Sequence, residues 1–315
     1  MKIVFMGTPE FAAPVLEKLI ERGHEIGFVV TQPDRKGNRG AVIFSPVKEV
    51  AVAHGIKVLQ PERLKNDEEA KSAIRGFAPD AMIVVAYGQI LKSDVLIIPR
   101  YGCFNVHASI LPELRGASPI QHAILNGMDR TGVTVMRMAE GIDDGDIIDF
   151  KTTKIGKKNL TELSAELSQM GADLMADTLE RIEDGEVRYT PQDESRATYC
   201  GMIGKQDGLI DFTRTAKSIE CKIRAFDPWP GAFSDLTEAN GKVTRVKFWS
   251  ADVVDHSEGD PGEITKADKT GIYISTGDGT LVLKELQVPG KKRVKAADYL
   301  LGHDLTGARF GSKEE

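Results

Sequence analysis

Short apolar runs alternate with amphipathic segments through the first half of the chain, and this alternation constrains the fold more than any other feature. The amphipathic segments have apolar residues at helical spacing, most clearly in the long stretch 161–182. Alternation of this kind predicts an α/β fold: a Rossmann-like, mainly parallel sheet with helices on both faces. The apolar runs have the length of β-strands and lie at 2–6, 26–30, 81–86, 103–106 and 132–138.

The second half of the chain has a different character. A polar stretch from about 186 to 208 lacks periodicity and is predicted to be a linker. A helix is expected over 215–225, and short strands separated by Gly and Asp turns are expected at 243–249, 271–275 and 280–288. Short strands of this kind predict a small β-barrel or sandwich. We therefore predict a first domain over 1–188, a linker over 189–206 and a second domain over 207–315.

Polar residues with catalytic potential follow two of the predicted strands. Asn105 and His107 are two residues apart at the end of a strand, so their side chains share one face. Asp143 lies in GIDDGD, after the next strand. If these strands are adjacent and parallel, both motifs reach the same carboxyl edge of the sheet. A lone histidine is usually structural, so the joint placement is what points to a site.

Several other kinds of site find no support in the sequence. Gly7 is followed by Pro9 and Phe11 where a G-x-G-x-x-G pattern needs other residues, and no Walker A pattern occurs. We interpret Gly7 as a tight turn and Thr8 as the cap of the next helix. The cysteines, which are expected to be buried thiols, and the other possible ligands form no metal-binding cluster, so no metal is expected. The cysteines are Cys103, Cys200 and Cys221.

The longer motifs resemble a known family. N-x-H, S-x-L-P, R-G-x-x-P-I and D-x-G, all between 105 and 145, are typical of folate-dependent formyltransferases. GTPEFA, TQPDR, SPVK, VVAYGQIL and AFDPWPGA are similar to segments of the methionyl-tRNA formyltransferases. The resemblance runs from Met1 to about Leu301, and the TQPDR and DPWPGA segments are its most specific parts. It implies that the second domain is an OB-like barrel that binds tRNA.

The resemblance also implies a reaction and its substrates. The formyl donor would be 10-formyltetrahydrofolate, the acceptor would be the amine of methionyl initiator tRNA, and the reaction would support translation initiation. Asn105, His107 and Asp143 would be catalytic, since a tetrahedral intermediate needs hydrogen-bond donors for its oxyanion and groups that move protons. Asp143 would orient His107 and favour its charged form. The folate would contact Ser109, Ile110, Leu111, Pro112, Tyr87, Gly88, Ile90, Leu91, Glu140, Gly141 and Ile142.

Binding of tRNA would depend on local basic patches, because the formal net charge of the chain is -6. The second domain alone has 16 Lys and Arg against 18 Asp and Glu, counted over 207–315. In the loop 31–44, Ala41 and Val42 replace two lysines that the family commonly has, so we expect weaker phosphate contacts there. The expected tRNA-binding residues are Arg35, Lys36, Arg39, Lys291, Lys292 and Arg293. A second group of basic residues comprises Lys242, Arg245 and Lys247.

Other functions stay open at this point. A nucleotide-sugar N-formyltransferase would use the same Asn-His-Asp site, although TQPDR and DPWPGA favour tRNA. A purine-pathway transformylase would lack 207–315, and a formyltetrahydrofolate hydrolase would need no such barrel. A non-catalytic RNA-binding protein would have no need of Asn105, His107 and Asp143. We expect a cytoplasmic protein with no membrane attachment, because the sequence contains neither a signal peptide nor a long apolar run. We also expect a monomer.

Overall fold

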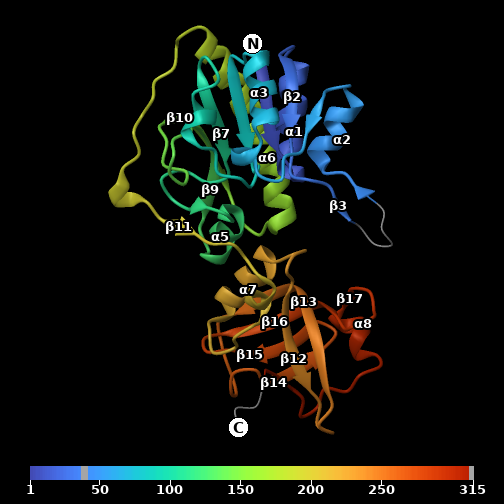
Figure 1. Cartoon of the computed structure of the whole chain (residues 1–315). Helices are drawn as coiled ribbons and strands as arrows, with labels where there is room; N and C mark the ends of the chain where they lie inside the picture. Colours follow the sequence, from blue (N-terminus) through green and yellow to red (C-terminus); the bar gives the residue numbers. More distant parts are fainter. Residues whose placement is uncertain (37–41, 312–315) are drawn as a thin grey trace. The chain divides into compact units, whose positions relative to one another are not determined.

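The computed structural model describes residues 1–36 and 42–311, with only the backbone of 35, 36 and 42 (Figure 1). The chain forms two compact units. The first comprises Met1–Pro119, Arg130–Lys154 and Ser164–Cys200. The second comprises Ile120–Asp129, Ile155–Leu163 and Gly201–Glu315. No helix among the described residues combines the length and the apolar character needed to cross a membrane.

A seven-stranded sheet forms the centre of the first unit, in the order β10-β9-β7-β6-β1-β2-β5. The five strands from β7 to β5 are parallel, whereas β9 runs antiparallel to β7, and β10 antiparallel to β9. This confirms the predicted mainly parallel sheet. The strands are β1 (Lys2–Gly7), β2 (Glu25–Val30), β5 (Val58–Leu59), β6 (Ala81–Val85), β7 (Gly102–His107), β9 (Arg130–Arg137) and β10 (Ile147–Lys154).

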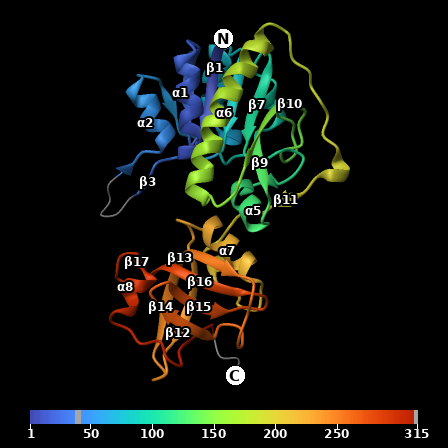
Figure 2. The same ribbon diagram turned by 180° about the vertical axis from the view of Figure 1, so that it is seen from behind.

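Helices cover both faces of this sheet. Helices α1 (Ala13–Glu21) and α6 (Leu160–Glu183) lie on one face, and α3 (Glu68–Phe77) lies on the other (Figures 1 and 2). Apolar side chains of α3 and of α4 (Ser93–Leu96) share one core with alternate residues of β1 and β6. Smaller elements of the unit are η1 (Glu10–Ala12), β3 (Arg35–Lys36), β4 (Val42–Ile43), α2 (Pro46–Ala53) and η3 (Leu64–Asn66).

One predicted helix cap is wrong. The helical segment after β1 begins at Pro9, which makes no capping bond, and Thr8 is engaged elsewhere: its Oγ1 accepts a hydrogen bond from the Gln32 backbone N–H at 3.1 Å. The interpretation of Gly7 agrees with its surroundings, because a Cβ atom at this position would lie 2.8 Å from the Val85 carbonyl oxygen. The chain therefore turns from strand to helix with no room for a side chain.

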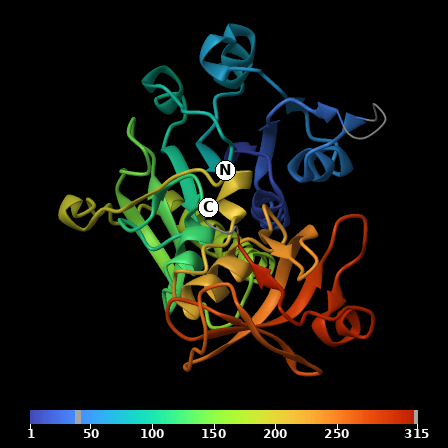
Figure 3. The same cartoon turned by 90° about the horizontal axis from the view of Figure 1, so that it is seen from below.

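The second unit is built on an antiparallel sheet in the order β14-β15-β16-β13-β12-β18, with β17 paired to β16. A bridge between Glu263 and Arg309 joins its two ends, and the strands curve round a core that includes Phe212, Phe248 and Phe310 (Figure 3). The predicted small barrel is confirmed. Its elements are α7 (Ala216–Ala225), β12 (Ala232–Thr237), β13 (Val243–Val254), β14 (Ile264–Asp268), β15 (Gly271–Ser275), β16 (Thr280–Gln287), β17 (Val294–Lys295), α8 (Ala296–Leu300) and β18 (Arg309–Phe310).

The segment predicted as a linker has structure of its own. After α6 the chain runs along the outside of β10, where Thr190 and Ile147 form a bridge (Figure 1). It then forms η4 (Glu194–Arg196) and β11 (Tyr199–Cys200), which pairs in parallel with β8 (Arg115–Gly116). Two further short helices are α5 (Pro119–Leu125) and η5 (Lys205–Gly208).

Candidate active site

Strand β7 positions two of the predicted catalytic residues on one face of the sheet. Val106, between them, points to the opposite face and packs against Gly171 of α6. Asn105 and His107 therefore face the other way, and the His107 side chain is only 7% exposed. The Oδ1 atom of Asn105 is buried and has no hydrogen-bond partner in the described part of the chain. Because buried polar atoms are normally paired, this atom marks a place where a further partner would be accommodated.

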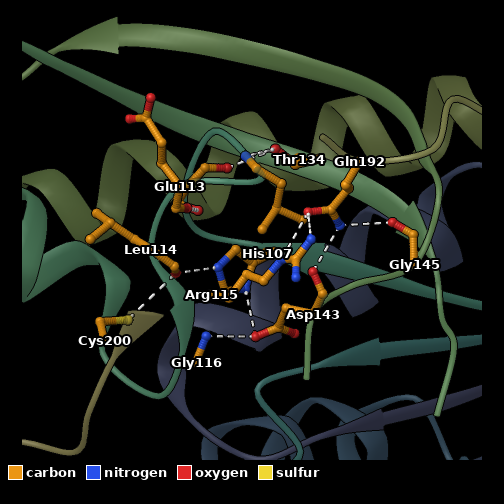
Figure 4. A network of polar contacts seen from close by, with 12 residues as sticks. His107, Glu113, Leu114, Arg115, Gly116, Thr134, Asp143, Gly145, Gln192 and Cys200 are labelled. Atoms are coloured by element: carbon orange, nitrogen blue, oxygen red, sulfur yellow. Dashed lines mark hydrogen bonds and ion pairs between the residues drawn. The ribbon is translucent and has the colours of Figure 1, made fainter. Parts of the chain in front are cut away.

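The His107 ring lies between two oxygen atoms (Figure 4). Its Nε2 is 2.9 Å from the Leu114 carbonyl oxygen, and its Nδ1 is 3.6 Å from Asp143 Oδ2. A carbonyl oxygen only accepts, so the hydrogen of this bond must be on Nε2. Nδ1 therefore faces the Asp143 carboxylate.

Asp143 reaches His107 by a route that differs from the predicted one. We expected adjacent parallel strands, but β9 is antiparallel to β7 and pairs Thr134 with His107. The end of β9 therefore lies beside the start of β7, where the Met138 N–H donates to the Cys103 carbonyl oxygen at 2.8 Å. The loop between β9 and β10 then folds back along the sheet. It is this loop, and not a shared strand edge, that brings Asp143 to the ring.

The backbone around Asp143 is strained and tightly held. Asp143 has a φ of 52°, in the left-handed region that non-glycine residues seldom adopt. Its Oδ2 also accepts a hydrogen bond from the Gly116 backbone N–H at 2.8 Å. Gly116 has a φ of 115°, and a Cβ atom there would lie 2.3 Å from the Cys200 carbonyl oxygen. Only glycine fits at the point where β8, β11 and Asp143 meet.

Two residues of this network were not predicted as site residues. Gln192 donates hydrogen bonds from Nε2 to the carbonyl oxygens of Asp143 and Gly145, both at 2.8 Å (Figure 4). Arg115, which is 1% exposed, donates to the Gln192 Oε1 at 3.0 and 2.9 Å. A hydrogen-bonded pair with Glu194 raises the pKa of Arg115. The signal that could have pointed to these residues was the arginine of R-G-x-x-P-I, since a buried arginine needs acceptors.

The predicted folate-binding stretch after β7 is held firmly against β9. Thr134 Oγ1 donates to the Ser109 carbonyl oxygen at 2.7 Å and accepts from the Leu111 N–H at 3.2 Å. The Ser109 hydroxyl donates to the Glu113 carbonyl oxygen at 2.5 Å, so it is already engaged. Leu111 and Pro112 are buried, while Ile110 is half-buried and more open to a ligand.

The other predicted folate residues lie in two loops and divide into buried and exposed groups. Tyr87 and Leu91 are buried in the core. Burial raises the pKa of Tyr87, whose hydroxyl has no partner among the described residues. Ile90 is 66% exposed and Ile142 is 57% exposed, so each loop presents an apolar side chain to solvent. Gly88, Glu140 and Gly141 are exposed as well.

The structure describes only some of the predicted tRNA-binding residues with their side chains. Arg39 and Ala41 lie outside the described residues, and Arg35 and Lys36 are described only as the backbone of β3. Lys291 and Lys292 are exposed. Arg293 is engaged inside the second unit: it pairs with Asp227 at 2.5 Å, and its guanidinium lies 3.6 Å from the centroid of the Trp249 ring.

The second group of basic residues is partly neutralised. Lys242 pairs with Glu238 at 3.0 Å, and Arg245 pairs with Asp235 at 2.9 Å. Lys247 lies over the Trp249 ring. The described residues contain no cluster of His, Cys, Asp and Glu that could hold a metal ion.

Two family models match the sequence. The model described as formyl transferase matches residues 1–179, and the model described as the formyl transferase C-terminal domain matches residues 202–304. A protein of Citrifermentans bemidjiense named methionyl-tRNA formyltransferase is 47% identical over 317 residues, which cover 100% of this chain and 98% of the relative.

Solved structures share the fold at low sequence identity. A sugar 3N-formyl transferase, solved in the presence of dTDP and 5-N-formyl-THF, has a TM-score of 0.66 at 20% identity and covers 93% of this chain and 99% of its own. HypX from Aquifex aeolicus, in complex with tetrahydrofolic acid, has a TM-score of 0.63 at 19% identity and covers 95% of this chain and 47% of its own.

Proposed function

This chain belongs to the formyl transferase family, and on that premise we propose that it transfers the formyl group of 10-formyltetrahydrofolate to the amine of methionyl initiator tRNA. The observation that carries the proposal is 47% identity, over both units, to a relative named methionyl-tRNA formyltransferase. In this proposal 1–188 catalyses the transfer, 207–315 binds tRNA, and 189–206 joins them. The protein would work in the cytoplasm as a monomer.

The geometry suits formyl transfer to an amine. The amine nitrogen attacks the formyl carbon, the tetrahedral intermediate carries an oxyanion, and the bond from carbon to the folate nitrogen then breaks. Asn105 and His107 lie on one face of β7, where the Asn105 amide and a protonated Nδ1 can donate to that oxyanion. Asp143 Oδ2 lies 3.6 Å from Nδ1, where the carboxylate can orient the ring. The amine loses one proton and the folate nitrogen gains one, with His107 or Asp143 relaying it.

Formylation assays with different acceptors test the proposal. Purified protein and 10-formyltetrahydrofolate would be incubated with methionyl initiator tRNA, methionyl elongator tRNA or an amino-sugar nucleotide. We expect turnover with the initiator tRNA. Turnover with the amino sugar alone would reassign the protein to the sugar N-formyltransferases. This alternative is tested because a sugar 3N-formyl transferase has the same fold. The absence of turnover with every acceptor would instead favour a non-catalytic RNA-binding protein.

Salt dependence gives a separate test of the tRNA contacts. If Lys291 and Lys292 contact phosphates, the KM for tRNA should rise steeply between 50 and 200 mM salt, by about tenfold or more, because phosphate binding releases counterions. The KM for the folate should change much less. Charge reversal by Lys291→Glu and Lys292→Glu together should raise the KM for tRNA further and flatten its salt dependence. An unchanged salt slope in this variant would exclude the two lysines from the phosphate contacts.

A further inference from the structure

The position of Asp143 depends on contacts outside its own loop. Its φ of 52° lies in the left-handed region that favours glycine, and the residue lies among others that are mostly exposed. Within the loop, Gly145 is packed so closely that a Cβ atom would lie 1.8 Å from the Arg137 carbonyl oxygen. That contact fixes the end of the loop, but it does not reach the Asp143 carbonyl group. Another group must hold the turn.

Gln192 is the side chain that holds it. A single Nε2 group donates to the carbonyl oxygens of Asp143 and Gly145, both at 2.8 Å, and so spans the strained turn. Gln192 follows α6 and is 49 residues from Asp143 in the sequence. The amide therefore fastens the turn to a different part of the unit.

Gln192 is itself fixed from the other side. Its Oε1 accepts two hydrogen bonds from the buried Arg115, which also donates to both carboxylate oxygens of Glu194, at 3.0 and 2.7 Å. Arg115 immediately precedes Gly116, whose N–H binds the Asp143 carboxylate. Asp143 is thus held twice, at its carboxylate by Gly116 and at its backbone by Gln192. Both supports originate at β8.

We propose that Gln192 is a positioning residue that holds Asp143 in place over His107. The inference rests on the proposed function for its catalytic consequence, whereas the structural hold on the Asp143 turn is independent of any reaction. Asp143 Oδ2 lies 3.6 Å from His107 Nδ1, and the proposed catalysis requires this distance to be kept. A misplacement of about 1 Å can reduce a rate by about 100-fold.

Gln192→Glu separates this role from general stability. The carboxylate has the same shape and still accepts from Arg115, so this attachment is retained. It has no N–H to donate, and it places negative charge against two carbonyl oxygens. We expect kcat to fall by about tenfold or more, while the KM for each substrate stays within about threefold and the melting temperature is retained.

Amide hydrogen exchange at Gly116 tests the hold without any reaction. The Gly116 N–H is protected by its bond to Asp143 Oδ2, so release of the turn should raise its exchange rate by about tenfold or more in Gln192→Glu. Asp193→Asn is the matched control, since it exchanges a carboxylate and an amide at the neighbouring, exposed residue and changes the charge by one unit, in the opposite direction. Its amide oxygen can still accept from the Ser195 N–H, so kcat and Gly116 exchange should both stay within twofold of the wild type.

A double-mutant cycle shows whether Gln192 acts through Asp143. In an Asp143→Ala background, Gln192→Glu should cause little further loss of kcat, because the group it positions is gone. The proposal would be overturned if the loss of kcat in the double variant equalled the product of the losses in the two single variants. It would also be overturned if Gln192→Glu left the Gly116 exchange rate unchanged. If the wild-type protein formylates no acceptor, the proposed function fails, yet the exchange measurement still decides whether Gln192 holds the turn.

Discussion

At the scale of single residues, the candidate site is a histidine between a carbonyl oxygen and a carboxylate. Leu114 fixes the hydrogen on Nε2, and Asp143 faces Nδ1. Asn105, on the same strand face, has a buried oxygen without a partner among the described residues. This arrangement is compatible with the proposed formyl transfer, since Nε2 is engaged by a carbonyl oxygen whereas Nδ1 faces the Asp143 carboxylate.

Removal of either the imidazole or the carboxylate should abolish most of the rate. We expect His107→Ala and Asp143→Ala each to lower kcat for formylation by at least about 100-fold, from the usual contributions of acid–base and oxyanion groups. Circular dichroism and melting curves should remain close to those of the wild type. The control is His54→Ala at the exposed end of α2, which should retain full activity. Near-normal rates in both site variants would refute the assignment.

Part of the geometry of this candidate site could be predicted from the sequence. Asn105 and His107 could be paired because the two-residue period of a strand is local information. The prediction that Asp143 lies near His107 assumed that β7 and β9 are parallel, and this assumption is wrong. Strand direction depends on pairing between distant segments, which the sequence of β9 does not encode. Gln192 lies in an aperiodic polar stretch, and its role becomes visible only when the buried Arg115 is seen to need acceptors.

At the scale of elements, α6 packs against the face of β7 that is opposite to Asn105 and His107. Gly171 in α6 allows the helix to approach Val106, the residue between Asn105 and His107. The sequence predicted α6 within one residue at each end, because its apolar residues follow the helical period over six turns or so. It did not predict β10, β12 or β14, in which charged or polar residues interrupt the apolar pattern.

Two glycine substitutions test this packing. Alanine gains up to about 1 kcal/mol over glycine in a helix, so Gly76→Ala in α3, where nothing lies within 4 Å of the new Cβ, should stabilise the protein. At Gly171 the Cβ would lie 2.7 Å from Val106 Cγ1, and overpacking of about 1–3 kcal/mol should outweigh the same gain. Urea unfolding measures both. Equal stabilisation by the two variants would show that α6 does not support β7 in this way.

At the scale of the whole molecule, each of the two units contains buried cysteines. Cys103 and Cys200 belong to the first unit and Cys221 to the second, and all three are free and buried. Burial raises the pKa of Cys103 to about 12 and also raises the pKa of Cys200 and Cys221. The folded protein binds these protons more tightly than the unfolded chain, whose thiols have a pKa of about 8.5. Stability should therefore fall as the pH rises above that value.

Alkylation should report the unfolding of each unit separately. At pH 8 in native buffer, iodoacetamide should label Cys103 and Cys221 at least about 100-fold more slowly than in urea, because the thiols are both protonated and inaccessible. Mass spectrometry of the two peptides across a urea series then follows the unfolding of one unit each. Labelling of Cys103 in native buffer at the unfolded rate would contradict its burial.

The late position of Gln192 in the chain has a consequence for synthesis. When the ribosome has completed α6, the nascent protein already contains every strand of the first sheet, from β1 to β10. It still lacks the amide that fastens the Asp143 turn and the strand that pairs with β8. The first sheet can therefore fold on the ribosome before the Asp143 turn is fixed. The candidate site is completed only when the segment that leads to the barrel has been synthesised.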